Sequence, residues 1–240
     1  MEHEIADHAK KAFKAMHNHE KSFWDKTKEV LFEILIIVFA VSFAALIERT
    51  REHYKEKSEA KEFVLGLKND LNNEILQLQT GKKDMDTLRI NYTFLLDLND
   101  KMIDSLAKIK DHKHSFNISK FNTRIANGRY DGFKSSGRIQ TIENDSLRND
   151  ILKFYEENVP FVDFTENVFN ANQVRLEDYF LNNADERTQT LKGAFKLMNT
   201  YKCKLIMKFT LSYSDAVLRG YNGALKQAKK IQAEINKEYH

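Results

Sequence analysis

The chain has 240 residues, and its 38 basic and 35 acidic side chains give a formal net charge of +3. Because opposite charges are interspersed, we expect no broad basic face and no nucleic-acid partner. Only one proline, Pro160, and eight glycines are present, whereas sheet-rich folds need turn residues at short intervals. The composition predicts an all-α protein, and the single Cys203 excludes an intrachain disulfide.

Residues 1–28 have the pattern of an amphipathic helix. The apolar positions at helical spacing are Ile5, Ala9, Phe13 and Met16. This pattern is typical of a helix lying along a membrane surface, and equally of a helix packed against its own chain. The aromatic pair at the end of the segment suits the interfacial belt of a membrane. The expected interfacial anchors are Phe13, Met16, Phe23 and Trp24.

Histidines in the same segment raise the question of a metal site. They are His3, His8, His17 and His19, and a second group is His112 and His114. Their spacing matches no closed zinc pattern, and two residues two positions apart point to opposite sides of a helix. We therefore expect no metal ion and no other cofactor.

The strongest pattern is an apolar run. Residues 30–47 are apolar apart from Glu33 and the small Ser42. At a rise of about 1.5 Å per residue they extend roughly 27 Å, close to the hydrocarbon thickness of about 30 Å. A helix that is apolar on all sides must be surrounded by protein or by lipid. We expect residues 29–48 to form a transmembrane helix rather than a soluble core helix.

A cleaved export signal is the alternative for this run. Such signals begin with a short basic region, whereas 29 residues precede Val30. We therefore expect an uncleaved anchor. Lysine and arginine are about as frequent after the run as before it, so their distribution leaves the orientation open.

Glu33 lies within the first turn of the apolar run. Its carboxylate could reach the headgroups or pair with Lys26 or Lys28 just outside the run. It could instead face a partner helix or a proton path, because ionisable groups inside membranes often serve a function. Glu33 is therefore the candidate for an intramembrane or partner contact.

Residues 49–240 are expected to form a helical bundle outside the membrane. Two apolar stripes at helical spacing, over residues 64–78 and 85–109, flank Gly81, so a turn there predicts an antiparallel hairpin. The glycines between residues 112 and 146 match no phosphate-loop spacing and indicate turns, with Asn144 or Asp145 capping the next helix.

Two further long segments complete the expected bundle. Pro160 should end or kink a helix near residues 158–159. A last helix should run from near Asp185 to about Lys237. The prediction is thus a transmembrane helix continuing into an antiparallel bundle of about four main helices.

Two stretches carry more specific motifs. One joins the Glu at the head of the apolar run, the charged helix after it and a Leu-Lys-x-Asp-Leu element at residues 67–71. The other, residues 133–156, has a Ser-Ser-Gly turn, an Asn-x-x-Leu-Arg helix start and the pair Phe154 and Tyr155. In these motifs the chain resembles an uncharacterised Bacteroidota family of single-pass membrane proteins. That resemblance implies a cytoplasmic N-terminus, a periplasmic helical domain and an inner-membrane location, but no activity.

No nucleophile and base can be paired from the sequence, so we expect no catalytic residue and no enzyme. The leading hypothesis is a membrane-anchored helical interaction or scaffold protein, with the bilayer, copies of itself or other membrane-protein subunits as partners. One alternative is an accessory subunit of an ion-driven or secretion machine that uses Glu33. Another is a periplasmic sensor that binds a ligand between helices.

Overall fold

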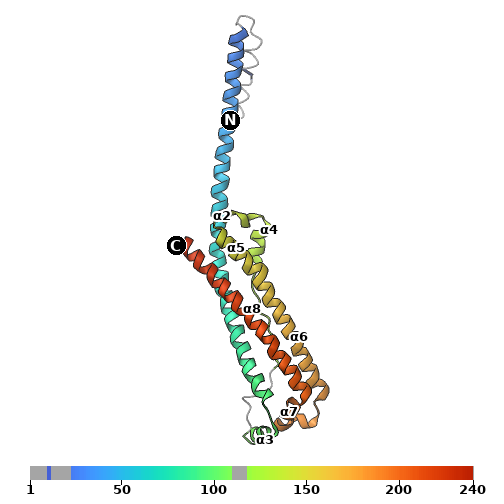
Figure 1. The fold of residues 1–240 in the computed structure, drawn as a ribbon. Coiled ribbons are helices and arrows are strands. Elements are labelled where there is room, and N and C mark those ends of the chain that lie inside the picture. The colour runs from blue at the N-terminus through green and yellow to red at the C-terminus, as the bar shows by residue number, and fades with distance from the viewer. Residues whose placement is uncertain (1–9, 12–22, 110–117, 240) are drawn as a thin grey trace. The chain divides into compact units, whose positions relative to one another are not determined.

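The structure is a computed structural model that describes residues 10–11, 23–109 and 118–239 (Figure 1). Every regular element in these ranges is a helix, which confirms the all-α prediction. The chain divides into two compact units, residues 1–59 and 60–240. The amphipathic helix predicted over residues 1–28 falls largely outside the described residues.

A single helix, α2 (Phe23–Leu96), belongs to both units. Residues 23–65 contain neither glycine nor proline, so nothing in this stretch interrupts the helical hydrogen bonds. The predicted long apolar helix near the N-terminus is therefore present. In the first unit, none of the described side chains of residues 24–59 is buried.

The core of the second unit is formed by α2 from Ala60 onward, α6 (Val159–Asn183) and α8 (Tyr201–Tyr239). Side-chain pairs between α2 and α8 join residues whose numbers rise along α2 and fall along α8, so the two helices are antiparallel. These pairs are Asn72 with Gln232, Lys82 with Asn222, and Arg89 with Asp215. Since α6 is also antiparallel to α8, α2 and α6 run in the same direction (Figure 1).

The predicted hairpin with a turn at Gly81 is wrong. Helix α2 continues through Gly81 to Leu96, and only then does the short α3 (Asp100–Ile109) follow. A glycine inside a helix costs about 1 kcal/mol relative to alanine. Here, however, its missing side chain makes room for a neighbour, because a Cβ at Gly81 would lie 3.1 Å from the Tyr221 hydroxyl oxygen.

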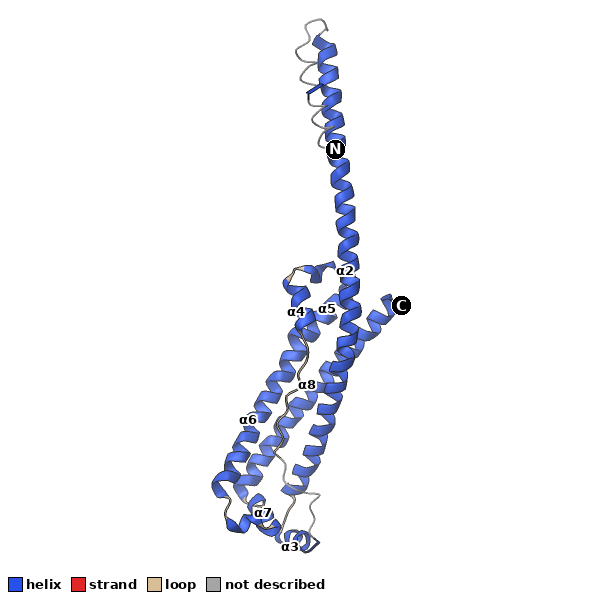
Figure 2. Cartoon of the chain, turned by 180° about the vertical axis from the view of Figure 1, so that it is seen from behind, coloured by secondary structure: helices blue, strands red, loops and turns tan. Residues whose placement is uncertain are grey.

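The chain returns along the bundle as an extended segment, residues 118–127, rather than as a helix (Figure 2). The Asn170 side chain accepts a hydrogen bond from the Phe121 N–H (2.9 Å) and donates one to its carbonyl (2.6 Å). Glu166 accepts another from the Thr123 N–H at 2.9 Å. Side chains of α6 thus supply the partners that a neighbouring strand would provide in a sheet.

Short elements connect this segment to α6. They are α4 (Gly128–Ser135), the 3₁₀ turn η1 (Arg138–Thr141), α5 (Asp145–Lys153) and the π-helical turn η2 (Phe154–Asn158). The Asn144 side chain accepts the Leu147 N–H at 3.1 Å, which confirms the predicted N-cap. The disruption predicted at Pro160 is also confirmed, since η2 lies directly before α6, which has the proline in its first turn.

The predicted start of the last helix near Asp185 is wrong. The segment instead forms η3 (Glu186–Gln189), α7 (Leu191–Met198) and then α8. A Cβ at Gly193 would lie 1.8 Å from the Arg187 carbonyl oxygen, so α7 packs directly on the η3 backbone. The Thr190 side chain accepts the Gly193 N–H and begins α7 as a separate helix.

Candidate functional site

The first candidate site is the apolar run of α2, residues 30–47. Ten large apolar side chains there are 53% to 68% exposed within the structure. By length and composition this part of α2 could cross a membrane, and none of its most apolar 18-residue window is buried. Monomeric soluble proteins rarely expose apolar patches above a few hundred Å². The segment is therefore compatible with a membrane anchor.

The residues predicted for this region lie on α2 where the structure describes them. Glu33 is half-buried, and its role as a partner or intramembrane contact stays a prediction. Trp24 is exposed, and it borders a shallow apolar depression with Leu31 and Leu35. Phe23 begins α2, whereas Phe13 and Met16 lie outside the described residues.

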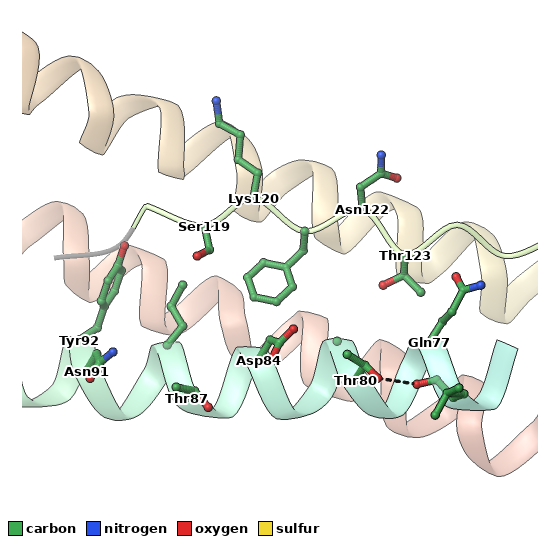
Figure 3. Close-up of a pocket in the computed structure, with 14 residues that line it drawn as sticks. Gln77, Thr80, Asp84, Thr87, Asn91, Tyr92, Ser119, Lys120, Asn122 and Thr123 are labelled. Atoms are coloured by element: carbon green, nitrogen blue, oxygen red, sulfur yellow. Dashed lines mark hydrogen bonds between the residues drawn. The ribbon is translucent and has the colours of Figure 1, made fainter. Parts of the chain in front are cut away.

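The second candidate site is a groove in the second unit, between α2 and the extended segment. It has a volume of about 700 Å³, within the range of small-molecule sites (Figure 3). Its polar lining from α2 consists of Gln77, Thr80, Asp84, Thr87 and Asn91. These residues recur every three or four positions and so share one face of the helix. The extended segment adds Ser119, Lys120, Asn122 and Thr123.

Polar and apolar atoms line the groove equally, and the polar part consists mainly of neutral hydrogen-bonding groups. The hydroxyls of Thr80 and Thr87 donate to carbonyls of their own helix, which leaves their oxygens able to accept from a ligand. Asp84 adds a carboxylate that points toward the extended segment (Figure 3). Lys120 is already ion-paired with Glu177 at 3.1 Å. These properties suit a small polar molecule better than a strongly charged one.

A buried hydrogen-bond cluster fixes one end of the groove. The Tyr221 hydroxyl donates to Glu166 Oε1 at 2.5 Å and accepts from the Thr123 hydroxyl at 3.2 Å. Burial raises the pKa of Tyr221 well above its usual range, and the neighbouring carboxylate adds to this. The tyrosine therefore stays a donor at neutral pH, and it holds the extended segment, α6 and α8 together at Gly81.

A second buried carboxyl group lies elsewhere in the core. Glu74 is 1% exposed and accepts a hydrogen bond from the Tyr155 hydroxyl at 3.1 Å. Burial raises the pKa of Glu74 to about 7, the Tyr155 bond opposes this, and the nearby Asp70 carboxylate adds to it. Among the described residues, its Oε2 atom has no hydrogen-bond partner. Glu74 is thus a titratable group inside the bundle.

The structure does not test whether the histidines considered above bind a metal ion. The six histidines considered, His3, His8, His17, His19, His112 and His114, lie outside the described residues. Within the described ranges, no group of three or more His, Cys, Asp or Glu side chains could hold a metal ion.

Sequence reasoning did not identify the groove or the two buried carboxyl groups. A usable signal existed, because Glu74 follows Leu67 and Leu71 at core spacing and precedes Leu78 on the same stripe. Glu166 likewise alternates with the buried Val162 and Phe169. A carboxylate at a core position of a helix predicts a buried polar partner. The groove had no such signal, because it depends on where the extended segment lies.

Comparison with known proteins yields one match. A family model described as a family of unknown function (DUF6090) matches residues 33–220, more than half of the chain. No curated protein matches and no solved structure matches. The matched region begins at Glu33 and includes the groove and the buried clusters, so these features lie within the part that the family shares.

Proposed function

We propose, on the premise that the chain belongs to a family of unknown function (DUF6090), that it is a membrane-anchored helical interaction protein. In this proposal it serves as a subunit of a membrane complex. The observation that carries the proposal is the apolar run of α2, ten of whose large side chains are exposed in the structure. Lipid would cover this surface without requiring a protein partner of matching shape.

The proposal places the anchor in the inner membrane of a Bacteroidota cell, with a cytoplasmic N-terminus and a periplasmic helical domain. The sequence resemblance supports this orientation. Binding rather than catalysis is proposed because the buried carboxyl groups have structural partners. Glu166 binds Thr123 and Tyr221, and Glu74 binds Tyr155. Such pairs fix helix positions inside a bundle.

Crosslinking in native membranes, followed by purification of the full chain in mild detergent, tests the proposal. We expect a defined homo-oligomer or a defined set of membrane-protein partners. Recovery of the chain as a monomer without partners would contradict it. The variant Glu33→Gln belongs in the same experiment. If Glu33 contacts a partner helix, the variant should lose the complex but remain in the membrane; if Glu33 reaches the headgroups, the complex should persist.

The groove supports a second candidate function, a sensor for a small polar ligand. Disaccharides and free amino acids are suitable probes, and binding at 100 times Kd should stabilise the chain by about 2.7 kcal/mol. The variants Gln77→Ala and Asn91→Ala should abolish that gain, whereas the exposed Asn149→Ala, outside the groove, should not. Absence of stabilisation by any probe at millimolar concentration would count against this function.

A further inference from the structure

The second unit carries an exposed apolar stripe where α6 and α8 lie side by side. Its most exposed members are Phe161 (44%) and Phe164 (63%) on α6, and Leu205 (39%) and Phe209 (51%) on α8. Half-buried side chains lie between them, and the rings of Phe209 and Tyr213 stack with centroids 6.5 Å apart. The α6–α8 stripe consists of Phe161, Phe164, Val168, Leu205, Phe209, Tyr213 and Ala216.

Contacts between the two helices show that these residues form one surface. The Asn172 amide donates to the Thr210 hydroxyl at 2.6 Å. Further along, a Cβ at Gly220 would lie 3.5 Å from a ring carbon of Phe161. With this antiparallel alignment, the stripe extends roughly 24 Å along the helices, from the level of Leu205 to that of Phe161.

The charges beside the stripe differ between the two helices. Exposed positions on α6 include Asp163 and Asp178, with Arg175 between them. Those on α8 include Lys208 and Arg219, and Asp215 between these two is paired with Arg89 of α2. From the alignment above, Asp163 lies at about the level of Arg219, whereas Asp178 lies roughly 7 Å along the helix axis from the level of Lys208. Acidic Asp163 on α6 and basic Arg219 on α8 therefore occupy matching levels along the stripe.

We propose that the α6–α8 stripe is the surface on which a second copy of this chain docks. The two-fold axis would run along the bundle, so that α6 of each copy lies against α8 of the other at the same level. In a two-fold interface the same patch must be complementary to itself. Here the apolar residues of both copies would meet at the centre. Asp163 of each copy would approach Arg219 of the other, and this pair would occur twice by symmetry.

The size of the stripe fits a partner that is held nearby. Its four most exposed side chains offer roughly 300–400 Å² per copy, about half of the roughly 800 Å² that each partner of a standard interface buries. Two copies anchored in one bilayer have a raised effective concentration, so a smaller interface suffices. The inference therefore rests on the proposed membrane anchoring, and it identifies a second copy of the chain as the partner.

Cysteine crosslinking of the full chain in liposomes tests the inference. Ala171 on α6 and Ser212 on α8 are both exposed and lie at nearly the same level of the stripe, so a mixture of Ala171→Cys and Ser212→Cys chains should form a disulfide between copies. Native Cys203 is buried and will not compete. In this mixture, Phe164→Glu or Phe209→Glu, introduced into both chains, should lower the crosslinked fraction at least tenfold. Ile90→Glu, at an exposed apolar position on α2 outside the stripe, should leave it unchanged.

A charge exchange provides the decisive comparison. Asp163→Arg and Arg219→Asp should each weaken crosslinking, and the two together should restore it. If the unaltered stripe gives no crosslink, or if the stripe variants and charge reversals have no effect, the inference is wrong. Flotation of the same samples with lipid, and recovery of other membrane proteins from native membranes, would show separately whether the proposed function still holds.

Discussion

The substitution Glu74→Gln removes a titratable group from the core of the second unit while keeping its shape. Its side-chain oxygen can still accept the Tyr155 hydroxyl, as Glu74 does at 3.1 Å. The two chains should therefore differ chiefly in their response to pH.

The expected magnitude follows from the pKa of Glu74, which burial raises from 4.5 to about 7. Between these values the folded chain retains a proton that the unfolded chain releases. The free energy of unfolding should therefore be highest below pH 4.5, fall as pH rises, and level off above pH 7. The full difference corresponds to about 3 kcal/mol.

Urea unfolding of the full chain in detergent micelles, measured from about pH 4.5 to pH 8, gives this quantity. Subtracting the free energy of unfolding of Glu74→Gln from that of the unaltered chain removes the contribution of other titrating groups. The difference should fall by about 3 kcal/mol over the range. The control is Asn149→Ala, at an exposed position without a titratable group, which should give a flat difference. A flat profile for Glu74→Gln as well would show that Glu74 does not retain a proton in the folded chain near neutral pH.

Three further substitutions, each with a control, test the Tyr221–Glu166 hydrogen bond, the packing at Gly81 and the membrane insertion of the apolar run. Tyr221→Phe should lower the free energy of unfolding, measured by urea titration, by about 2 kcal/mol, because buried Glu166 loses a hydrogen-bond donor. Tyr201→Phe, at an exposed position, should change it by less than about 0.5 kcal/mol. Gly81→Ala should destabilise the chain despite the better helix propensity, because the new methyl group would press on buried Tyr221. Gly132→Ala in α4, with open space around it, should instead gain about 0.5–1 kcal/mol; equal effects would contradict this explanation. Val38→Arg in the apolar run should cost about 2.5–3.5 kcal/mol of membrane insertion and reduce the membrane-bound fraction, whereas Val38→Leu should not.

Features set by neighbours in sequence could be predicted. The apolar run was recognisable because its composition alone decides what can surround it. The cap at Asn144 and the disruption before Pro160 follow from the local chemistry of those residues. The apolar stripes also gave the helical class correctly.

Features set by distant residues could not be predicted. Gly81 lies inside α2, and the neighbour that requires its small size is Tyr221 of α8, which is distant in sequence. The extended segment is stable because Asn170 and Glu166 on α6 bind its backbone, which no local pattern reveals. The groove exists only because that segment lies beside α2. The predicted hairpin, with its turn at Gly81, therefore gave no indication of the groove.

In the proposed function, residues 30–47 lie in lipid and anchor the chain. Flotation of the full chain with liposomes, after washes in high salt and at alkaline pH, measures this directly. The anchored chain should rise with the lipid, and replacing several apolar residues of the run with charged ones should leave it at the bottom of the gradient. An unaltered chain that stays dissolved in detergent-free buffer and does not rise would contradict the anchoring.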